Sequence, residues 1–290
     1  MFEQYVIPGD GVFPEGITEG IGRHEFYVSA SAGGAIYRGD TGRRELEPWL
    51  PGGEDGRVST LGLALDGHGR ILICGGRSKA FYAYNLSSGD LEERHEYAGF
   101  LNDVCVHGGF AYLTDSHNPR ILRAEVGEKG VGAPELWLDL STEETDPFFN
   151  GIVPTPDGSA IVWAAQGSHH LWRAAVSQTP GSSGKAEMID VGDLLIAGDG
   201  MVFVGDVLYI CDNTDEADGS ARFWLTALTS SDGWRSAELA GRWERPAADT
   251  PTTVAHRDGR LLLVNSQFVG RDKGTAAAPF TVSAVPLPTV

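Results

Sequence analysis

The stretch that decides the fold spans residues 102–126 and reads NDVCVHGGFAYLTDSHNPRILRAEV. It begins with the polar pair Asn102-Asp103, runs through a short apolar segment and turns at Gly108-Gly109. A second apolar run ends at Asp115, and a third run follows a short polar turn. Two hydrophobic runs joined by a glycine turn are typical of a β-hairpin. The stretch therefore predicts three consecutive antiparallel strands.

Pairs of this kind recur at the starts of further apolar runs, and neighbouring pairs lie 41 to 53 residues apart. The six pairs are Glu15-Gly16, Leu61-Gly62, Asn102-Asp103, Asn150-Gly151, Asp199-Gly200 and Thr252-Thr253. A repeat of this length, built from short strands, is typical of a β-propeller with one four-stranded sheet per repeat. We therefore expect an all-β fold, a six-bladed β-propeller whose four-stranded antiparallel blades surround a central channel. Residues 1–290 are expected to form this single domain.

The two ends of the chain bear on how such a ring closes. Residues 5–7 read as a short strand, Tyr-Val-Ile, that is expected to complete the ring. Residues 280–285 read as a final strand, which we expect to join a blade begun elsewhere in the chain.

Composition excludes several classes of partner. The formal net charge of −18 leaves no basic stripe for nucleic acid and disfavours anionic membranes. No apolar stretch approaches the ~20 residues of a membrane span, and the first residues lack the basic and apolar regions of a signal peptide. The cysteines Cys74, Cys105 and Cys211 are odd in number and lack metal-site spacing, which favours free thiols in a reducing compartment. We therefore expect a cytoplasmic protein that acts on a small molecule, and nothing in the sequence fixes its oligomeric state.

Four of the six pairs begin with a residue that can bind a cation. In a propeller the first strand of each blade lines the axis, so Glu15, Asn102, Asn150 and Asp199 would meet at one end of the channel. Two carboxylates and two amides form an all-oxygen set suited to Ca²⁺, Mg²⁺ or Mn²⁺, and less typically to Zn²⁺. The alternative is that these side chains only hydrogen-bond channel water and strand ends.

The same pairs carry a resemblance to a known family. The chain resembles the regucalcin, gluconolactonase and luciferin-regenerating-enzyme family of six-bladed propellers over roughly residues 14–265. The matching motifs are Glu15-Gly16 in the first blade, Asn102-Asp103 in the third, Asn150-Gly151 in the fourth and Asp199-Gly200-Met201 in the fifth. The resemblance implies that Glu15, Asn150 and Asp199 ligate one divalent cation, with Ca²⁺ as the first choice. It implies that Asn102 contacts substrate or metal-bound water.

Two departures from the family pattern bear on the substrate. Ile17-Thr18-Glu19-Gly20 stands where the family has an aromatic and an acidic residue after its first-blade pair. Thr60-Leu61-Gly62 lacks the arginine-rich loop expected for sugar lactones. The resemblance therefore bears on the fold and the cation site more than on the substrate.

Three functions remain open at this point. The first is a metal-dependent hydrolase of a lactone or related ester, in which Asp199 accepts the proton of water and Asn102 positions substrate or stabilises the oxyanion. The second is a cyclase or isomerase acting in the same pocket on an apolar intermediate of specialised metabolism. The third is a propeller that binds a ligand or partner without catalysis.

Aromatic and histidine residues near the predicted site bear on that choice. Phe148 and Phe149 directly precede Asn150 and are expected to wall an apolar substrate pocket, with core packing as the alternative. His117, His169 and His170 lie near turns that would face the same end of the channel. One of them could act as an acid or base, although a surface position is the simpler expectation.

Overall fold

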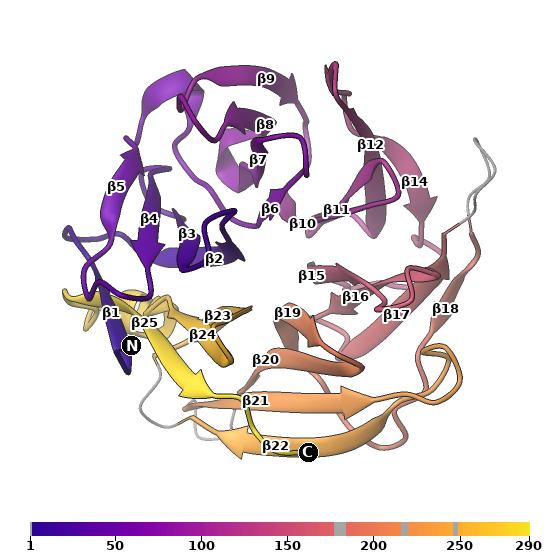
Figure 1. Cartoon of the computed structure of the whole chain (residues 1–290). Coiled ribbons are helices and arrows are strands. Elements are labelled where there is room, and N and C mark those ends of the chain that lie inside the picture. The colour runs from indigo at the N-terminus through magenta and orange to yellow at the C-terminus, as the bar shows by residue number, and fades with distance from the viewer. Residues whose placement is uncertain (1, 177–183, 216–219, 246–248) are drawn as a thin grey trace.

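The computed structural model describes residues 2–176, 184–215, 220–245 and 249–290. In these residues the strands form six antiparallel sheets that stand around a common axis (Figure 1). Within each sheet, strands next to one another are also neighbours in sequence, except where the chain ends meet and where β14 (Glu135–Asp139) pairs with β12 (Arg120–Gly127). The predicted all-β, six-bladed propeller is confirmed.

The first three blades follow the predicted repeat. Blade 1 comprises β2 (Pro14–Glu19), β3 (Glu25–Ala30), β4 (Ile36–Asp40) and β5 (Glu47–Leu50). Blade 2 comprises β6 (Leu63–Leu65), β7 (Arg70–Cys74), β8 (Ala80–Asn85) and β9 (Leu91–Glu96), and the short 3-10 turns η1 (Glu54–Gly56) and η2 (Gly76–Ser78) lie before and within it. Blade 3 comprises β10 (Leu101–His107), β11 (Phe110–Asp115), β12 (Arg120–Gly127) and β14 (Glu135–Asp139), with the additional short strand β13 (Gly130–Val131) paired to the end of β12.

The other three blades include the junction of the chain ends. Blade 4 comprises β15 (Phe149–Pro154), β16 (Ala160–Ala165), β17 (His170–Ala175) and β18 (Ala186–Met188). Blade 5 comprises β19 (Gly198–Val204), β20 (Val207–Asp215), β21 (Ala221–Thr229) and β22 (Glu238–Glu244). Blade 6 comprises β23 (Pro251–Arg257), β24 (Arg260–Asn265), β25 (Phe280–Pro286) and β1 (Gln4–Ile7), with the helix α1 (Phe268–Asp272) between β24 and β25.

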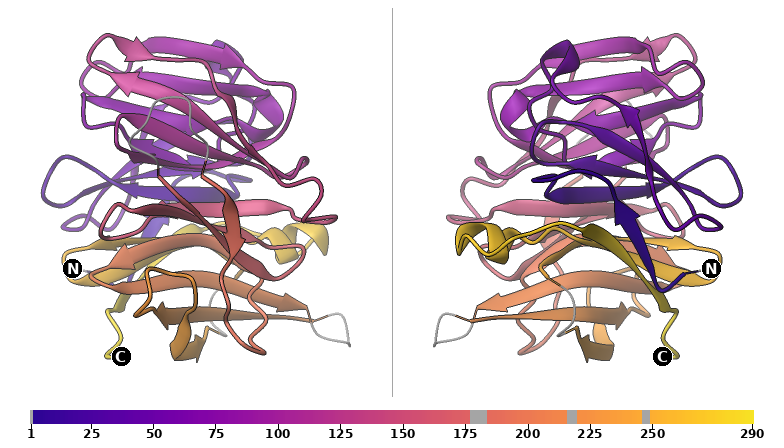
Figure 2. Two further views of the ribbon diagram at one scale, coloured as in Figure 1. Left: turned by 90° about the vertical axis from the view of Figure 1, so that its right-hand side faces the viewer. Right: turned by 90° about the vertical axis from the view of Figure 1, so that its left-hand side faces the viewer.

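The ring is closed by the first strand of the chain. β1 is the outermost strand of blade 6 and pairs antiparallel with β25, so the predicted closing role of residues 5–7 is confirmed. The expectation for the last strand was wrong, because β25 pairs with β24 of its own repeat. Seen from the side, α1 lies at one face of the ring (Figure 2).

The hydrophobic core lies between the blades. Each of six clusters of buried side chains joins two neighbouring sheets, as where Phe26 and Val28 of blade 1 pack with Leu262 of blade 6. The second strands are buried on both faces, which explains why β16 reads as the continuous apolar run AIVWAA. The three cysteines are free and buried in these clusters, and burial raises their thiol pKa values, which disfavours the reactive thiolate.

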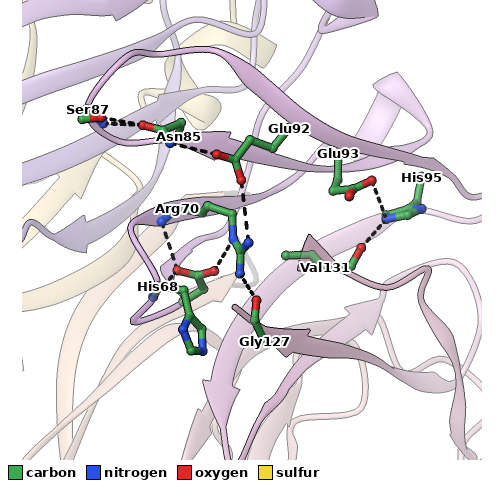
Figure 3. A network of polar contacts seen from close by, with 10 residues as sticks. His68, Arg70, Asn85, Ser87, Glu92, Glu93, His95, Gly127 and Val131 are labelled. Carbon is green, nitrogen blue, oxygen red and sulfur yellow. Dashed lines mark hydrogen bonds and ion pairs between the residues drawn. The ribbon is translucent and has the colours of Figure 1, made fainter. Parts of the chain in front are cut away.

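A buried ion pair adds a polar tie between blades 2 and 3. The Arg70 Nε atom lies 2.5 Å from a carboxylate oxygen of Asp66, and another nitrogen of the guanidinium donates to the Gly127 carbonyl at 2.5 Å (Figure 3). The His95 ring nitrogen Nε2 lies 2.8 Å from the Val131 carbonyl oxygen. The contacts of Arg70 with Gly127 and of His95 with Val131 cross from blade 2 to the β12–β13 hairpin, so they hold this extra strand in place. No described helix is long and apolar enough to cross a membrane.

Candidate active site in the channel mouth

The first strands of five blades are interrupted at the same place. Their register with the second strands shifts by one residue, which marks a β-bulge. The bulged pairs are Glu15-Gly16, Asn102-Asp103, Asn150-Gly151, Asp199-Gly200 and Thr252-Thr253. Bulges change the direction in which a side chain points and are common beside active sites. Five of the six pairs that define the sequence repeat are therefore bulges at the axis.

The glycine in these pairs has a packing role. A Cβ atom on Gly151 would lie 2.3 Å from the Asp199 carbonyl oxygen of the next blade. A Cβ atom on Gly62 would lie 2.1 Å from the Asp103 carboxylate in the same way. First strands of neighbouring blades approach each other closely here, and only glycine leaves the space that this approach needs.

The first residues of four of the pairs meet in one cavity. Glu15, Asn102, Asn150 and Asp199 all line a cavity of about 870 Å³, although they come from four different blades. The cavity opens at the face that carries α1, because Phe268 and Arg271 line it as well. The structure thus brings the four predicted side chains together, as the propeller argument required. The other end of the channel is a separate space of about 520 Å³ that Asp103 lines.

Asn213, which lines the cavity, has a buried oxygen without a hydrogen-bond partner among the described residues, and three of the four predicted side chains each carry another such oxygen. Those three oxygens are Oε2 of Glu15, Oδ1 of Asp199 and Oδ1 of Asn102. The Glu15 and Asp199 side chains belong to residues that are only 5% and 7% exposed. Buried polar atoms are nearly always paired, and each unpaired one calls for an explanation.

Hydrogen bonds fix the direction of the Asn102 amide. The Ser116 hydroxyl donates to the Phe149 carbonyl oxygen at 2.6 Å, so it can only accept from Asn102. The Asn102 Nδ2 atom accordingly donates to Ser116 Oγ at 2.8 Å, which turns Oδ1 away from Ser116. In the fourth blade the Asn150 Nδ2 atom donates to Gln166 Oε1 at 3.0 Å. Each amide is therefore held through its nitrogen, which leaves its oxygen available to a ligand.

The buried carboxyls disfavour one another's ionisation. Burial, and then the carboxyls of Asp199 and Asp103, raise the pKa of Glu15 well above its usual range. Burial and the Asp103 carboxyl likewise raise the pKa of Asp199, and hydrogen bonds from surrounding amides oppose this only in part. Burial raises the pKa of Asp103 to about 7, against hydrogen bonds from the Val104 and Ile152 amides. In the cation-free protein the ionised forms of these carboxyls are thus disfavoured, and a bound cation would favour them.

These residues fit a hard divalent cation. Ca²⁺ and Mg²⁺ prefer oxygen ligands, and the three unpaired oxygens are two carboxylates and one amide. Among the described residues no three His, Cys, Asp or Glu side chains form a metal cluster, because only two of the four polar residues here are acidic. That composition disfavours a nitrogen- or sulfur-rich zinc site.

The two phenylalanines before Asn150 have different roles. Phe148 has a positive φ of 36°, is 39% exposed and lines the cavity. Phe149 is fully buried and contacts Trp163 edge-on, with ring centroids 6.2 Å apart. Its assignment to a substrate wall is therefore corrected: Phe149 is a core residue, and its carbonyl oxygen rather than its ring bears on the site through Ser116.

The histidines also separate. His169 lines the cavity with a positive φ of 62°, and its buried Nδ1 atom has no partner among the described residues. His170 instead lies 2.7 Å from the Glu144 carboxylate. His117 stacks on Phe100, with ring centroids 4.7 Å apart. Of the three, His169 is the one that lines the cavity.

Other lining residues were missed by the sequence analysis. Arg77, Gln166 and Arg271 line the cavity from segments between second and third strands. Those segments differ in length and composition from blade to blade, so they carry no repeat pattern. Only their turn positions, which lie on the same face as the first-strand starts, could have indicated them.

Comparisons with known proteins bear on the fold. No family model and no curated protein sequence matches the chain. The solved structure of the major allergen Mala s 1 of Malassezia sympodialis is similar, with a TM-score of 0.73 and 18% identity over 98% of this chain and 96% of that one. A calcium-binding regucalcin from Agrobacterium tumefaciens gives a TM-score of 0.69 and 16% identity over 97% and 95% of the chains. A luciferin-regenerating enzyme gives a TM-score of 0.65 and 12% identity over 97% of this chain and 95% of that one. All three are six-bladed propellers, and at these identities the likeness shows the shared fold alone.

Proposed function

We propose that this protein is a divalent-cation-dependent hydrolase that opens a lactone or a related ester in the channel cavity. The observation that carries the proposal is the set of three unpaired buried oxygens on Glu15, Asn102 and Asp199. The similarity to a structure described as a calcium-binding protein supports Ca²⁺ as the first cation to test.

Glu15 and Asp199 would hold the cation through their unpaired carboxylate oxygens, and Asn150, whose amide nitrogen is held by Gln166, would add its amide oxygen. When bound, the cation would polarise the ester carbonyl and favour the ionised forms of both carboxyls. The Asp199 carboxylate would then accept a proton from the attacking water as the oxygen of that water bonds to the carbonyl carbon. When the carbon–oxygen bond to the leaving group breaks, Asp199 returns the proton to the leaving oxygen, and a hydroxy acid results.

Asn102 positions the reactants in this proposal. One hydrogen of its amide is held by Ser116, and its Oδ1 atom is free to accept a hydrogen bond from water or from a substrate hydroxyl. The free Oδ1 atom supports the positioning role, and the second amide hydrogen leaves one donor for a developing oxyanion.

The test is cation binding and turnover measured on the same variants. Protein stripped with EDTA is titrated calorimetrically with Ca²⁺, Mg²⁺, Mn²⁺ and Zn²⁺, and the loaded protein is assayed on a panel of lactones. We expect Glu15→Gln and Asp199→Asn to lose binding and hydrolysis together. Glu19→Gln is the matched control, because Glu19 lies on the same strand β2 but is exposed and paired with Arg257. If a double variant with both Glu15→Gln and Asp199→Asn bound the cation and hydrolysed lactones at wild-type levels, the proposal would be overturned.

The apolar side of the cavity supports a second candidate, a cyclase or isomerase acting on an apolar intermediate. Phe148 and Leu195 remain exposed at the cavity mouth. Conversion of such an intermediate without water uptake, by a protein inactive on every lactone of the panel, would favour this candidate.

A further inference from the structure

Exposed apolar side chains line the cavity on the side of blades 4 and 5. Phe148 and Leu195 precede the first strands of blades 4 and 5, and they are 39% and 66% exposed. Phe223 of β21 in blade 5 adds to this apolar side. Large apolar side chains left exposed at a concave site are normally covered by a ligand.

Two arginines line the cavity from the other side. Arg77 lies in η2 of blade 2, and Arg271 lies in α1 of blade 6. Blade 1 stands between these two blades in the ring (Figure 1). In a chain with a net charge of −18, these two guanidinium groups oppose the prevailing charge, although the Asp272 carboxylate beside Arg271 offsets part of it.

Contacts to blade 1 bring the two arginines toward the same point. A terminal nitrogen of Arg77 donates to the Ser31 carbonyl at 2.6 Å. The Arg271 guanidinium lies over the rings of Phe268 and Phe13, 4.5 Å and 5.8 Å from their centroids. Ser31 and Phe13 are themselves bonded, because the Ser31 hydroxyl and amide both donate to the Phe13 carbonyl. Both guanidinium groups thus contact one bonded pair of residues, of which Phe13 lies two positions before Glu15.

These contacts leave each guanidinium able to bind an anion. A guanidinium has five N–H donors, and the described residues take one from Arg77 and one, through Asp272 at 2.9 Å, from Arg271. Arginine recognises carboxylates and related planar anions with two parallel hydrogen bonds. The cavity volume of about 870 Å³ is large for a simple ring lactone and lies in the range of ~300–1,000 Å³ that holds drug-sized ligands.

We propose that the substrate is an extended apolar or aromatic molecule with a carboxylate or similar anionic group, which Arg77 and Arg271 bind beside blade 1. Its apolar body covers Phe148 and Leu195, and its reactive carbonyl lies over the oxygens of Glu15, Asn102 and Asp199. This assignment rests on the proposed function for the reaction, but the binding of the anion itself requires neither the cation nor catalysis.

The test compares two probes that share an apolar body. 8-Anilinonaphthalene-1-sulfonate carries an anionic group, and N-phenyl-1-naphthylamine is its neutral analogue. Each is titrated by fluorescence into full-length protein in EDTA, so that failure of the cation proposal leaves the measurement intact. We expect the sulfonate to bind wild-type protein more tightly than the neutral probe does.

The variants separate recognition of the charge from recognition of the apolar body. The double variant Arg77→Gln with Arg271→Gln should bind the sulfonate probe at least tenfold more weakly than wild type does. Its affinity for the neutral probe should change less than twofold. Phe148→Ala should weaken both probes. Arg43→Gln is the control, because Arg43 is an exposed arginine paired with Glu47 outside the cavity, and it should change neither. The proposal is overturned if the double variant binds the sulfonate as wild type does, or if it loses both probes equally.

Discussion

Replacing Asp103 by asparagine should make the stability of the cation-free protein less dependent on pH. Asp103 lies at the axis, where its carboxylate oxygens accept hydrogen bonds from the Val104 amide at 2.8 Å and the Ile152 amide at 3.2 Å. Burial nevertheless raises its pKa from 3.8 to about 7. The folded protein therefore keeps a proton on Asp103 at pH values where the unfolded chain has lost it.

The sign and size follow from that difference. A pKa raised by folding gives stability that is complete below the unfolded value and declines as pH rises through the folded value. At about 1.4 kcal/mol per pH unit, the loss is about 4 kcal/mol in all, of which about 2.5 kcal/mol falls between pH 5 and pH 8. Asp103 is partly exposed to the narrow end of the channel, so water there reduces the effect. Between pH 5 and pH 8, the unfolding free energy of Asp103→Asn should therefore rise by about 1 to 2.5 kcal/mol relative to that of wild type.

Urea denaturation at pH 5, 6, 7 and 8 in EDTA measures this difference directly. The loss of the Ile152 hydrogen bond changes the unfolding free energy of the variant by the same amount at every pH. It therefore leaves the slope of that free energy against pH unaffected. Asp157→Asn is the control, because hydrogen bonds led by the Ser159 amide lower the pKa of this exposed turn residue, which is ionised in both states above pH 5. A free-energy difference between Asp103→Asn and wild type that stays the same from pH 5 to pH 8 would refute the reasoning.

Two further substitutions test the geometry of the site. Gly151→Ala places a Cβ atom 2.3 Å from the Asp199 carbonyl oxygen, so it should lower the unfolding free energy by about 1–3 kcal/mol and weaken cation binding. Gly127→Ala is the control, because no atom lies within 4 Å of its Cβ, and it should change neither quantity. Chemical denaturation and calorimetric titration measure the two effects. Phe149→Ala should cost about 3–5 kcal/mol by thermal or chemical denaturation, because the ring is fully buried, while Phe148→Ala should cost less than about 1 kcal/mol; equal costs would contradict the placement of the two rings.

The fold was predictable because close packing at the axis leaves a trace in the sequence. Gly16, Gly62, Gly151 and Gly200 recur because a Cβ atom at any of them would collide with the next blade. These glycines lie one or two blade lengths apart, and the ring follows from the six copies of the pair. The bulges themselves were not predictable, since no local pattern distinguishes a bulged pair from a regular one.

The floor of the site was predictable, and its walls were not. Glu15, Asn102, Asn150 and Asp199 sit at a repeated position, so the topology alone brings them together. The wall residues belong to segments whose paths depend on local contacts, as where Arg77 reaches the Ser31 carbonyl of another blade. Side-chain direction was equally inaccessible at Phe148, where a positive φ of 36° turns one of two adjacent rings into the cavity.

The pairing of β1 with β25 also determines the order in which the molecule can be completed. β1 is the first described strand and β25 the last, so β1 cannot join its sheet until β25 exists, although the Val6 backbone also bonds to Arg44 and Leu46 of the first repeat. Five blades can form from contiguous sequence as the chain grows, whereas the sixth must wait. A circular permutant that joins the two ends and begins at β2 would make every blade contiguous. Such a chain should form its sixth blade without the long-range pairing of residues near 5 and 282, and its folding rate should rise accordingly.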